Sequence, residues 1–277
     1  MLAAACALGA SIAWGLADFL GGLKSRTVPL LVVLLLAQVS GIAGIGLVVA
    51  IAGNSPPGSS VLWAVLAALF GTVGLASFYR GMAVGSISVV APIVAVAVVV
   101  PVTFGIATGD DVSRTQITGF VFALVGIALA SFERREGGAA RVAAGVPWAI
   151  PAMIGFGGYY IPMHEASEQD FLWAALVFRA SVGAMAFAAW LVLRPALAAA
   201  RGSLWTIALI GVADTAANVL FAAASNQGDV SIVSVLSTLY PVTTIALAAV
   251  LLSERVDRLQ QLGVVAALAG VVLISAS

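Results

Sequence analysis

The chain alternates between long apolar stretches and short polar breaks that hold most of its charged residues. Each apolar stretch is roughly 20 residues long, the length with which a helix crosses a hydrocarbon core of ~30 Å. The pattern therefore predicts about ten membrane-spanning helices. We expect them near residues 2–20, 28–52, 61–79, 87–106, 115–132, 146–163, 171–193, 204–224, 231–252 and 259–275.

A repeat divides these predicted helices into two sets of five. Residues 110–131 and 254–275 match without a gap, each as a charged turn followed by an apolar stretch with two glycines. The matching pairs are Asp110 and Glu254, Val112 and Val256, Arg114 and Arg258, Gln116 and Gln260, Gly119 and Gly263, Gly126 and Gly270, and Ser131 and Ser275. Weaker matches, with small shifts in offset, pair Gly15 with Gly158, Gln38 with Arg179, Ser40 with Ser181 and Gly71 with Gly211.

The densest run of charged residues lies between the two halves. We therefore predict a first five-helix repeat at residues 1–132, a charged linker at 133–145 and a second five-helix repeat at 146–277. Because five is odd, the second repeat must enter the membrane inverted relative to the first. Inverted repeats are the architecture of many secondary transporters, which bind substrate near the bilayer midplane between the repeats.

Composition agrees with an all-α integral membrane protein. Of the 277 residues, 62% are hydrophobic and 9% are charged, whereas soluble domains carry about 25% charged residues. The single Cys6 excludes a disulfide framework and a cysteine metal site, and the zero net charge gives no reason to expect a nucleic-acid partner. The first stretch has no basic residues before it, so we interpret it as a membrane helix and not as a cleaved signal.

The basic residues predict an orientation in the membrane. Lysine and arginine are enriched in cytoplasmic loops. The odd-numbered loops hold Lys24, Arg26, Arg80, Arg134, Arg135, Arg141, Arg194, Arg201, Arg255 and Arg258, whereas the even-numbered loops hold only Arg114. This distribution places the odd loops in the cytoplasm and both ends of the chain outside.

The sequence resembles the EamA-type branch of the drug/metabolite transporter superfamily over nearly its whole length. The most specific residues are Trp14-Gly15, residues 78–83 (FYRGMA) leading to 88–93 (SVVAPI), and Pro241 followed by Ser253-Glu-Arg255 and Gln261-Leu-Gly263. The first half departs from the family pattern in having Asp110 where glutamate is usual. The resemblance implies carriage of small metabolites across a bacterial inner membrane without ATP, often as export of amino acids, and it implies both termini in the cytoplasm. For orientation we follow the loop charges.

Two charged residues fall near the middle of predicted helices, Arg179 and Asp214. A charge within the membrane normally faces a partner or a water-filled cavity. One hypothesis is that both line a central cavity, where Arg179 holds an anionic group and Asp214 a cationic group or a proton. The alternative is a structural pair that only joins two helices. Asn218 follows Asp214 by four residues and extends the same helix face.

Further candidate substrate-binding residues are Trp14, Asp18, Gln38 and Tyr159. Trp14 and Asp18 share a helix face and could present an acid beside an aromatic wall to a cationic or ring-bearing substrate, or form an interfacial pair near the lipid headgroups. Gln38 is the repeat mate of Arg179, which favours an inward position for both. Tyr159, with Tyr160 beside it, could line the cavity or belong to an aromatic belt, and the neighbouring Gly157, Gly158 and Pro162 indicate close helix approach or a bend.

Three prolines fall inside predicted helices and are candidate bend points for alternating access: Pro92, Pro101 and Pro241. Proline removes a backbone hydrogen bond and can kink a helix. Membrane helices also tolerate such prolines without a functional role.

The sequence offers little support for an enzyme. His164-Glu165 begins like a zinc-protease motif but has no second histidine, and no phosphate-binding Gly-Lys-Ser/Thr loop is present. We therefore expect no catalytic residues, metal or cofactor. The function predicted is secondary export of small polar metabolites such as amino acids, by alternating access around a cavity between the repeats. Drive would come from the substrate gradient or from proton exchange at Asp18 and Asp214. The alternative is a flippase of lipid-linked sugars or phospholipids with the same architecture. The expected surroundings are a small-molecule substrate and the lipid bilayer, with a monomer or a homodimer both open.

Overall fold

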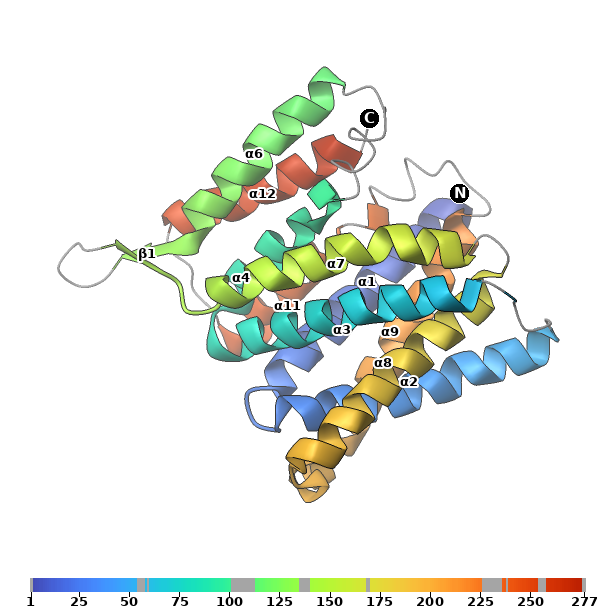
Figure 1. The fold of residues 1–277 in the computed structure, drawn as a ribbon. Coiled ribbons are helices and arrows are strands. Elements are labelled where there is room, and N and C mark those ends of the chain that lie inside the picture. The colour runs from blue at the N-terminus through green and yellow to red at the C-terminus, as the bar shows by residue number, and fades with distance from the viewer. Residues whose placement is uncertain are drawn as a thin grey trace.

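The computed structural model describes residues 2–53, 58, 60–100, 113–134, 140–167, 170–225, 236–237, 239–253 and 258–275. These residues form ten α-helices, shown in Figure 1: α1 (Leu2–Lys24), α2 (Leu30–Ala52), α3 (Ser60–Val84), α4 (Ile87–Ala95), α6 (Arg114–Ser131), α7 (Val146–Ser167), α8 (Phe171–Leu193), α9 (Leu204–Ser225), α11 (Tyr240–Leu252) and α12 (Arg258–Ser275). Two 3₁₀ segments, η1 (Val96–Val98) and η2 (Leu197–Ser203), follow α4 and precede α9. The fold is that of an all-α membrane protein, as the sequence predicts.

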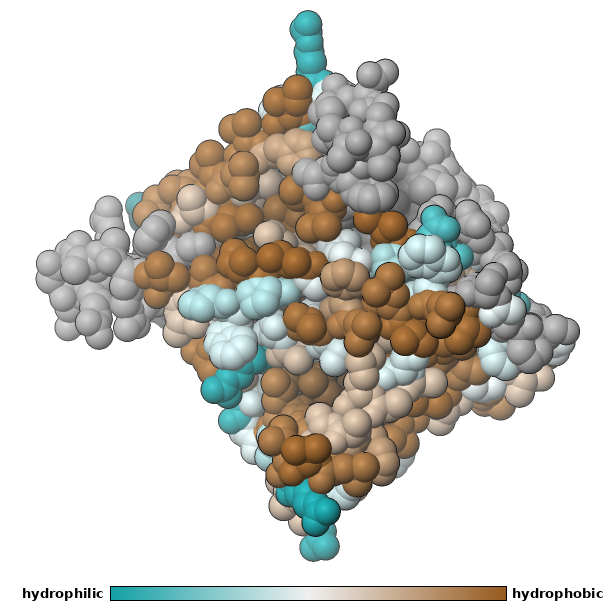
Figure 2. Space-filling view, viewed as in Figure 1, coloured by the Kyte–Doolittle hydropathy of each residue, from teal (hydrophilic) through white to brown (hydrophobic). Residues whose placement is uncertain are grey.

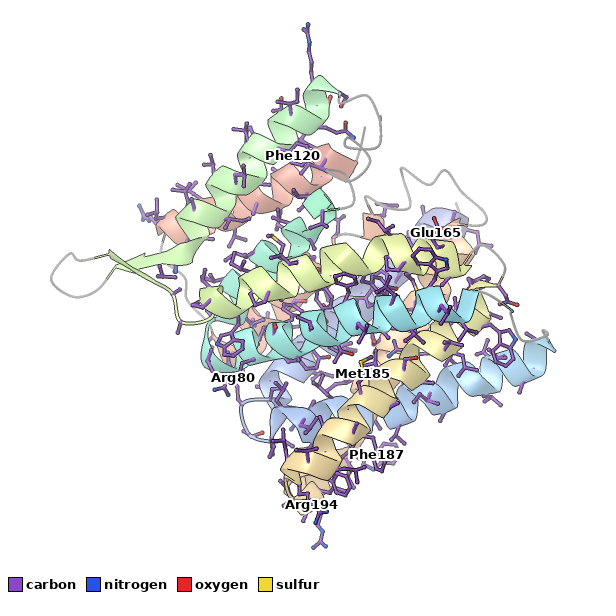
Figure 3. All side chains as sticks on the ribbon, in the orientation of Figure 1. Arg80, Phe120, Glu165, Met185, Phe187 and Arg194 are labelled. Carbon is purple, nitrogen blue, oxygen red and sulfur yellow. The ribbon has the colours of Figure 1, made fainter. Side chains whose placement is uncertain are left out.

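Five segments in the described part of the chain are long and apolar enough to cross a membrane. They are α1, α2, Val61–Val84 in α3, α8, and Leu197–Phe221 in η2 and α9. The outer surface is apolar to match, since large side chains such as Ile51, Leu124 and Val265 are more than half exposed. Figure 2 shows apolar residues covering most of the visible face, with hydrophilic residues near its edges. In Figure 3, Arg194 lies at the far end of α8, where such a residue would meet water or headgroups.

The predicted boundaries hold best where the helix ends are capped. Helix α8 begins and ends where the sequence predicts, because the Asp170 carboxylate accepts hydrogen bonds from the backbone N–H groups of Leu172 (2.8 Å) and Trp173 (3.1 Å). At its other end Arg194 adopts a left-handed conformation with φ of 45°. The charged linker contains two short antiparallel strands, β1 (Phe132–Arg134) and β2 (Ala140–Val142). Three residues are too few to show a strand period in sequence.

One proline prediction is wrong. Pro241 was expected inside a helix of residues 231–252, but α11 begins at Tyr240 and Pro241 lies in its first turn. A proline there removes no intrahelical hydrogen bond, because the first N–H groups of a helix have no partner within it. Pro241 therefore does not kink α11.

The helix contacts have a two-fold pattern that exchanges the halves. The third helix of each half packs against the first helix of the other, as α3 on α7 and α9 on α1. The second, fourth and fifth helices each pack against their own counterparts, as α2 on α8, α4 on α11 and α6 on α12. This set of contacts is unchanged when the halves are exchanged. It is the arrangement expected of two repeats related by a pseudo-two-fold axis.

The repeated glycines lie at this axis, between α6 and α12. A Cβ atom at Gly119 would lie 2.9 Å from the carbonyl oxygen of Gly270, and one at Gly126 would lie 2.7 Å from that of Gly263. The two helices are thus antiparallel. Gly119 faces Gly270, the repeat mate of Gly126, and Gly126 faces Gly263, the repeat mate of Gly119. Membrane helices that approach this closely need small residues at the contact. Figure 1 shows α6 and α12 together at one edge of the molecule.

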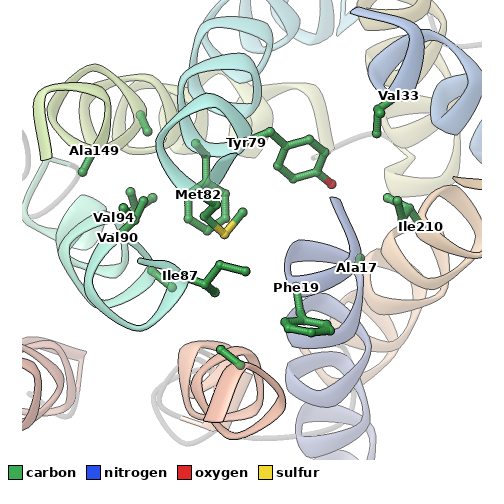
Figure 4. Close-up of a cluster of buried hydrophobic side chains, with 14 of the residues drawn as sticks. Ala17, Phe19, Val33, Tyr79, Met82, Ile87, Val90, Val94, Ala149 and Ile210 are labelled. Atoms are coloured by element: carbon green, nitrogen blue, oxygen red, sulfur yellow. The ribbon is translucent and has the colours of Figure 1, made fainter. Parts of the chain in front are cut away.

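The main apolar core lies between α1, α3, α4, α7 and α9. Its largest fully buried side chains include Phe19, Phe78, Met82, Ile87 and Ile210. Figure 4 shows this cluster, with Met82 and Ile87 between the helices that carry Val90 and Phe19. The core holds the first half against α7 and α9 of the second half.

Candidate functional site

An ion pair joins the two charged residues that the sequence places in the middle of helices. Arg179 is the ninth of the 23 residues of α8, and Asp214 is the eleventh of the 22 residues of α9. The Arg179 guanidinium donates to the Asp214 carboxylate through its Nη2 group. Arg179 is 2% exposed, whereas the Asp214 side chain is 28% exposed. The pair therefore has one deeply buried member and one that remains partly accessible.

Gln38 of α2 completes the surroundings of the guanidinium. The side-chain oxygen of Gln38 lies 3.4 Å from Nη1 of Arg179 and accepts a hydrogen bond from it. Gln38 is 3% exposed. The two repeat mates thus meet each other, which is possible because their helices pack together near the pseudo-two-fold axis. The prediction that both face inward is consistent with this contact.

Small residues on α2 and α9 make room for this polar group. A Cβ atom at Gly41 would lie 3.2 Å from Nη1 of Arg179 and 3.0 Å from the Thr215 hydroxyl. A Cβ atom at Gly211 would overlap the carbonyl oxygen of Ala37, so α2 and α9 approach each other closely there. The Thr215 hydroxyl donates to the Gly211 carbonyl (2.8 Å) and is 3.4 Å from that of Gly41. Thr215 is a member of the group that no sequence pattern indicates.

Asp18 of α1 is a further carboxyl group near Asp214. Asp18 is partly exposed, interacts electrostatically with Asp214, and makes no hydrogen bond or ion pair within the described part of the chain. A charge within the membrane normally faces a partner or a water-filled cavity. Asp18 therefore differs from Asp214, which Arg179 neutralises.

Tyr79 also belongs to the group, although it is not among the predicted site residues. It is 2% exposed and interacts electrostatically with Asp18, Asp214 and Arg179. Its ring fits against Gly21 of α1, where any Cβ atom would overlap it. Figure 4 shows the hydroxyl directed toward the helices that carry Val33 and Ile210. The predicted helix stopped at Tyr79 because Arg80 follows, but α3 continues to Val84 and so places Tyr79 inside.

An aromatic cluster surrounds Trp14. The Trp14 ring lies 5.7 Å from that of Phe221 and 6.5 Å from that of Tyr240, measured between ring centroids. These partners come from α9 and α11, so Trp14 packs against helices of the second half. The Thr244 hydroxyl donates to the Gly15 carbonyl (3.1 Å) and fixes α1 against α11 at this level. Phe221 and Tyr240 were not predicted, because a lone aromatic residue in an apolar stretch carries no signal.

The remaining predicted residues lie apart from this group or extend it. Tyr159 packs edge-to-face on Phe178 at 5.1 Å, between α7 and α8. The Asn218 amide donates to the Asp214 backbone carbonyl (2.6 Å) and so lies directly beside it. Pro92 lies within α4, which gives way to the 3₁₀ segment η1 four residues later. Pro101 and the side chain of Tyr160 lie outside the described residues.

The close approach expected around Gly157 and Gly158 is present. A Cβ atom at Gly157 would lie 2.7 Å from the carbonyl oxygen of Ala97, and one at Gly158 would lie 2.7 Å from the ring of Phe70. Pro162 is buried in α7. These residues therefore pack α7 against its neighbours.

Taken with the two-fold helix contacts, the polar group defines a class: an integral membrane protein of two related halves with buried charges where they meet. The EamA-like transporter family matches the chain twice, at residues 1–132 and 143–276. The chain belongs to this family of membrane transporters. A solved crystal structure is similar in fold, with a TM-score of 0.64, 15% sequence identity and coverage of 98% of this chain and 95% of that one. No curated protein matches the sequence.

Proposed function

We propose that the chain is a secondary transporter that exports small polar metabolites, amino acids among them, by alternating access between its halves. The observation that carries the proposal is the polar group formed by Asp18, Gln38, Arg179 and Asp214. Two of these residues come from each half and all lie within helices. Charged groups within a membrane are rare and mark substrate or ion pathways.

The two-fold helix contacts supply a means of alternation. Because the halves are related in sequence and contacts, each can adopt the conformation of the other, which would open the site to the opposite side. Pro92 is the bend point that this motion uses, since α4 changes to a 3₁₀ segment just after it. Movement of α4 would shift its contacts with α7 and α11, against which it packs.

Proton exchange is the drive we propose besides the substrate gradient. Asp18 and Asp214 are the carboxylates in the site, and both remain partly exposed. A group that is partly exposed within a membrane protein can exchange protons with a water-filled cavity. Asp18 is the stronger candidate because it has no partner within the described residues.

Uptake into proteoliposomes tests the proposal. Purified protein is reconstituted, and labelled amino acids are offered with and without a pH gradient. Wild-type protein is expected to transport at least one of them, faster with the gradient. Arg179→Ala is expected to lose at least about tenfold of the rate, equivalent to about 1.4 kcal/mol, while Arg201→Ala, at an exposed position in η2, is expected to keep it.

A second variant separates loss of function from loss of fold. Removing one member of a buried pair leaves an unpaired charge, which destabilises a protein by about 3–5 kcal/mol. The double variant Arg179→Gln with Asp214→Asn keeps hydrogen-bonding side chains without charge and is expected to fold but not to transport. If it transports at the wild-type rate, the pair is only structural. If wild-type protein moves no amino acid, labelled phospholipids and lipid-linked sugars test the flippase alternative.

A further inference from the structure

We infer that the face between α1 and α9 is a binding site for organic amines, with an acidic part for the ammonium group and an aromatic part for an apolar ring. This inference rests on the proposed function and names the class of substrate that the site selects. It narrows the polar metabolites to cations that carry an apolar body.

Helices α1 and α9 present matched faces. On α1, Trp14 and Asp18 are four residues apart, and on α9, Asp214 and Phe221 are seven apart, so each pair shares one helix face. Trp14 contacts Phe221, and Asp18 interacts with Asp214. The helices are therefore antiparallel, with the two acids at one level and the aromatic rings at another. At about 1.5 Å of rise per residue, the two levels are about 6 Å apart along α1 and about 10.5 Å apart along α9.

The acidic part holds two carboxyl groups and one guanidinium. They belong to Asp18, Asp214 and Arg179. Arg179 already neutralises Asp214, so Asp18 is the carboxyl group left without a cation within the described residues. An ammonium group beside Asp18 would supply that cation, and a charge-assisted hydrogen bond is stronger than a neutral one.

Within the described residues, the site has no free cationic group for an anion. The Arg179 guanidinium is 2% exposed and binds both Asp214 and Gln38. A substrate carboxylate would have to displace Asp214 to reach it, and would then meet the charge of Asp18. The geometry thus disfavours a zwitterion relative to the amine that lacks its carboxylate.

The aromatic part suits a ring or a cation at its edge. Trp14, Phe221 and Tyr240 come from three helices. The ring centroid of Trp14 lies 5.7 Å from that of Phe221 and 6.5 Å from that of Tyr240. Aromatic rings attract one another in offset or edge-to-face geometry, and they also attract an ammonium group. An amine whose nitrogen stands a short chain away from its ring would bridge the two levels.

Three probes with one ring and different charges test the inference. They are phenethylamine (a cation), phenylalanine (a zwitterion) and 3-phenylpropionate (an anion), each titrated calorimetrically into the purified full-length protein in detergent. Phenethylamine is expected to bind at least about tenfold more tightly than phenylalanine, and 3-phenylpropionate is expected not to bind. Equal or tighter binding of phenylalanine, or no binding of phenethylamine, overturns the inference.

Substitutions at two residues, Asp18 and Trp14, locate the site. Asp18→Asn is expected to weaken phenethylamine binding at least tenfold, and Asp18→Glu to keep the order of the three probes. Trp14→Leu is expected to weaken binding several-fold. The matched controls are Glu165→Gln on α7 and Trp205→Leu, whose side chain is 91% exposed, and both are expected to bind as wild type. Unchanged binding by Asp18→Asn overturns the inference, because Asp18 has no partner within the described residues and the variant is therefore expected to fold.

The binding and uptake experiments fail separately. If proteoliposomes take up amino acids in a manner that needs Arg179 while phenethylamine does not bind, the amine site is wrong and the transporter stands. If phenethylamine binds as expected but neither it nor any amino acid crosses the bilayer, the proposed function is wrong and the binding site stands.

Discussion

At the scale of single residues, the polar group depends on Gly41, which has no Cβ atom. A Cβ atom there would crowd the Thr215 hydroxyl at 3.0 Å and the Arg179 guanidinium at 3.2 Å. The guanidinium has little freedom to move, because it is 2% exposed and bonded to Asp214 and Gln38. The charge pair is therefore fitted to the backbone of α2 as well as to its side chains.

A pair of glycine substitutions on α2 tests this. Gly46→Ala meets open space within 4 Å, so it should stabilise the helix by up to about 1 kcal/mol through alanine's higher helix propensity. Gly41→Ala gains the same propensity but places a Cβ atom 3.0–3.2 Å from Thr215 and Arg179, so its unfolding midpoint should be lower than that of Gly46→Ala and its uptake slower. For both variants, the unfolding midpoint is measured by thermal unfolding in detergent and the uptake rate is measured in proteoliposomes. Equal midpoints and equal uptake for the two variants would contradict the fit.

At the scale of helices, the α6–α12 contact is the clearest case of close packing. Its four glycines, Gly119, Gly126, Gly263 and Gly270, each face backbone atoms of the opposite helix. Backbone cannot move aside as a flexible side chain can. Lipid tails are as apolar as the helix surface, so the contact is held by packing and not by the hydrophobic effect.

Substitution at these glycines should therefore separate the helices. Gly126→Ala is expected to destabilise the protein by roughly 1–3 kcal/mol, as overpacking does, and its repeat mate Gly270→Ala should cost about the same because the contact is two-fold symmetric. Val121→Leu adds a carbon on the outward face of α6, where the side chain is 54% exposed, and should be neutral. Unfolding midpoints in detergent decide the matter. A neutral Gly126→Ala would mean that α6 and α12 are not in backbone contact.

The sequence predicts the helices better than it predicts the group they form. The apolar stretches, the repeat and the Asp170 cap are local signals, so α8 has its predicted ends and Gln38 meets its repeat mate. No local sequence signal indicates that Tyr79 and Thr215 belong to the group. Their positions depend on how far α3 continues past Arg80 and on how closely α2 approaches α9, and both follow from packing.

Pro241 illustrates the same limit from the opposite side. An apolar stretch shows where a helix can form but not where it begins within that stretch. The sequence counted Pro241 as a kink because it lay inside residues 231–252, and only the structure shows α11 beginning at Tyr240. The predicted helix begins at residue 231 and α11 at Tyr240, nine residues later, and this difference moves Pro241 from the interior of a helix to its first turn.

At the scale of the whole molecule, the loop charges and the family resemblance make opposite predictions of orientation. Either orientation in the membrane is compatible with the two inverted halves, because exchanging them leaves this set of helix contacts unchanged. What breaks the symmetry is the distribution of lysine and arginine, with ten in or beside the odd-numbered loops, including Arg80 near the end of α3, and Arg114 alone beside the even-numbered loops. Such residues are retained in the cytoplasm during insertion, so we expect both ends of the chain to lie outside.

Reporter fusions distinguish the two orientations. Alkaline phosphatase is active only outside the cytoplasm, and green fluorescent protein folds efficiently only within it. Fused after Ser277, phosphatase should be active and the fluorescent protein dark; inserted in the linker at residues 133–145, the two should give the reverse. The matched insertions control for expression, because each reporter is tested on both sides of the same protein. Fluorescence at the C-terminal fusion with an inactive phosphatase would show the family orientation, and would mean that ten basic residues in or beside the odd loops do not decide the topology of this chain.

With both ends outside, the odd-numbered loops face the cytoplasm, and the Asp18 end of α1, six residues before Lys24, is the nearer to the cytoplasm. An exported amine would then reach the acidic part of its site first and the aromatic part second.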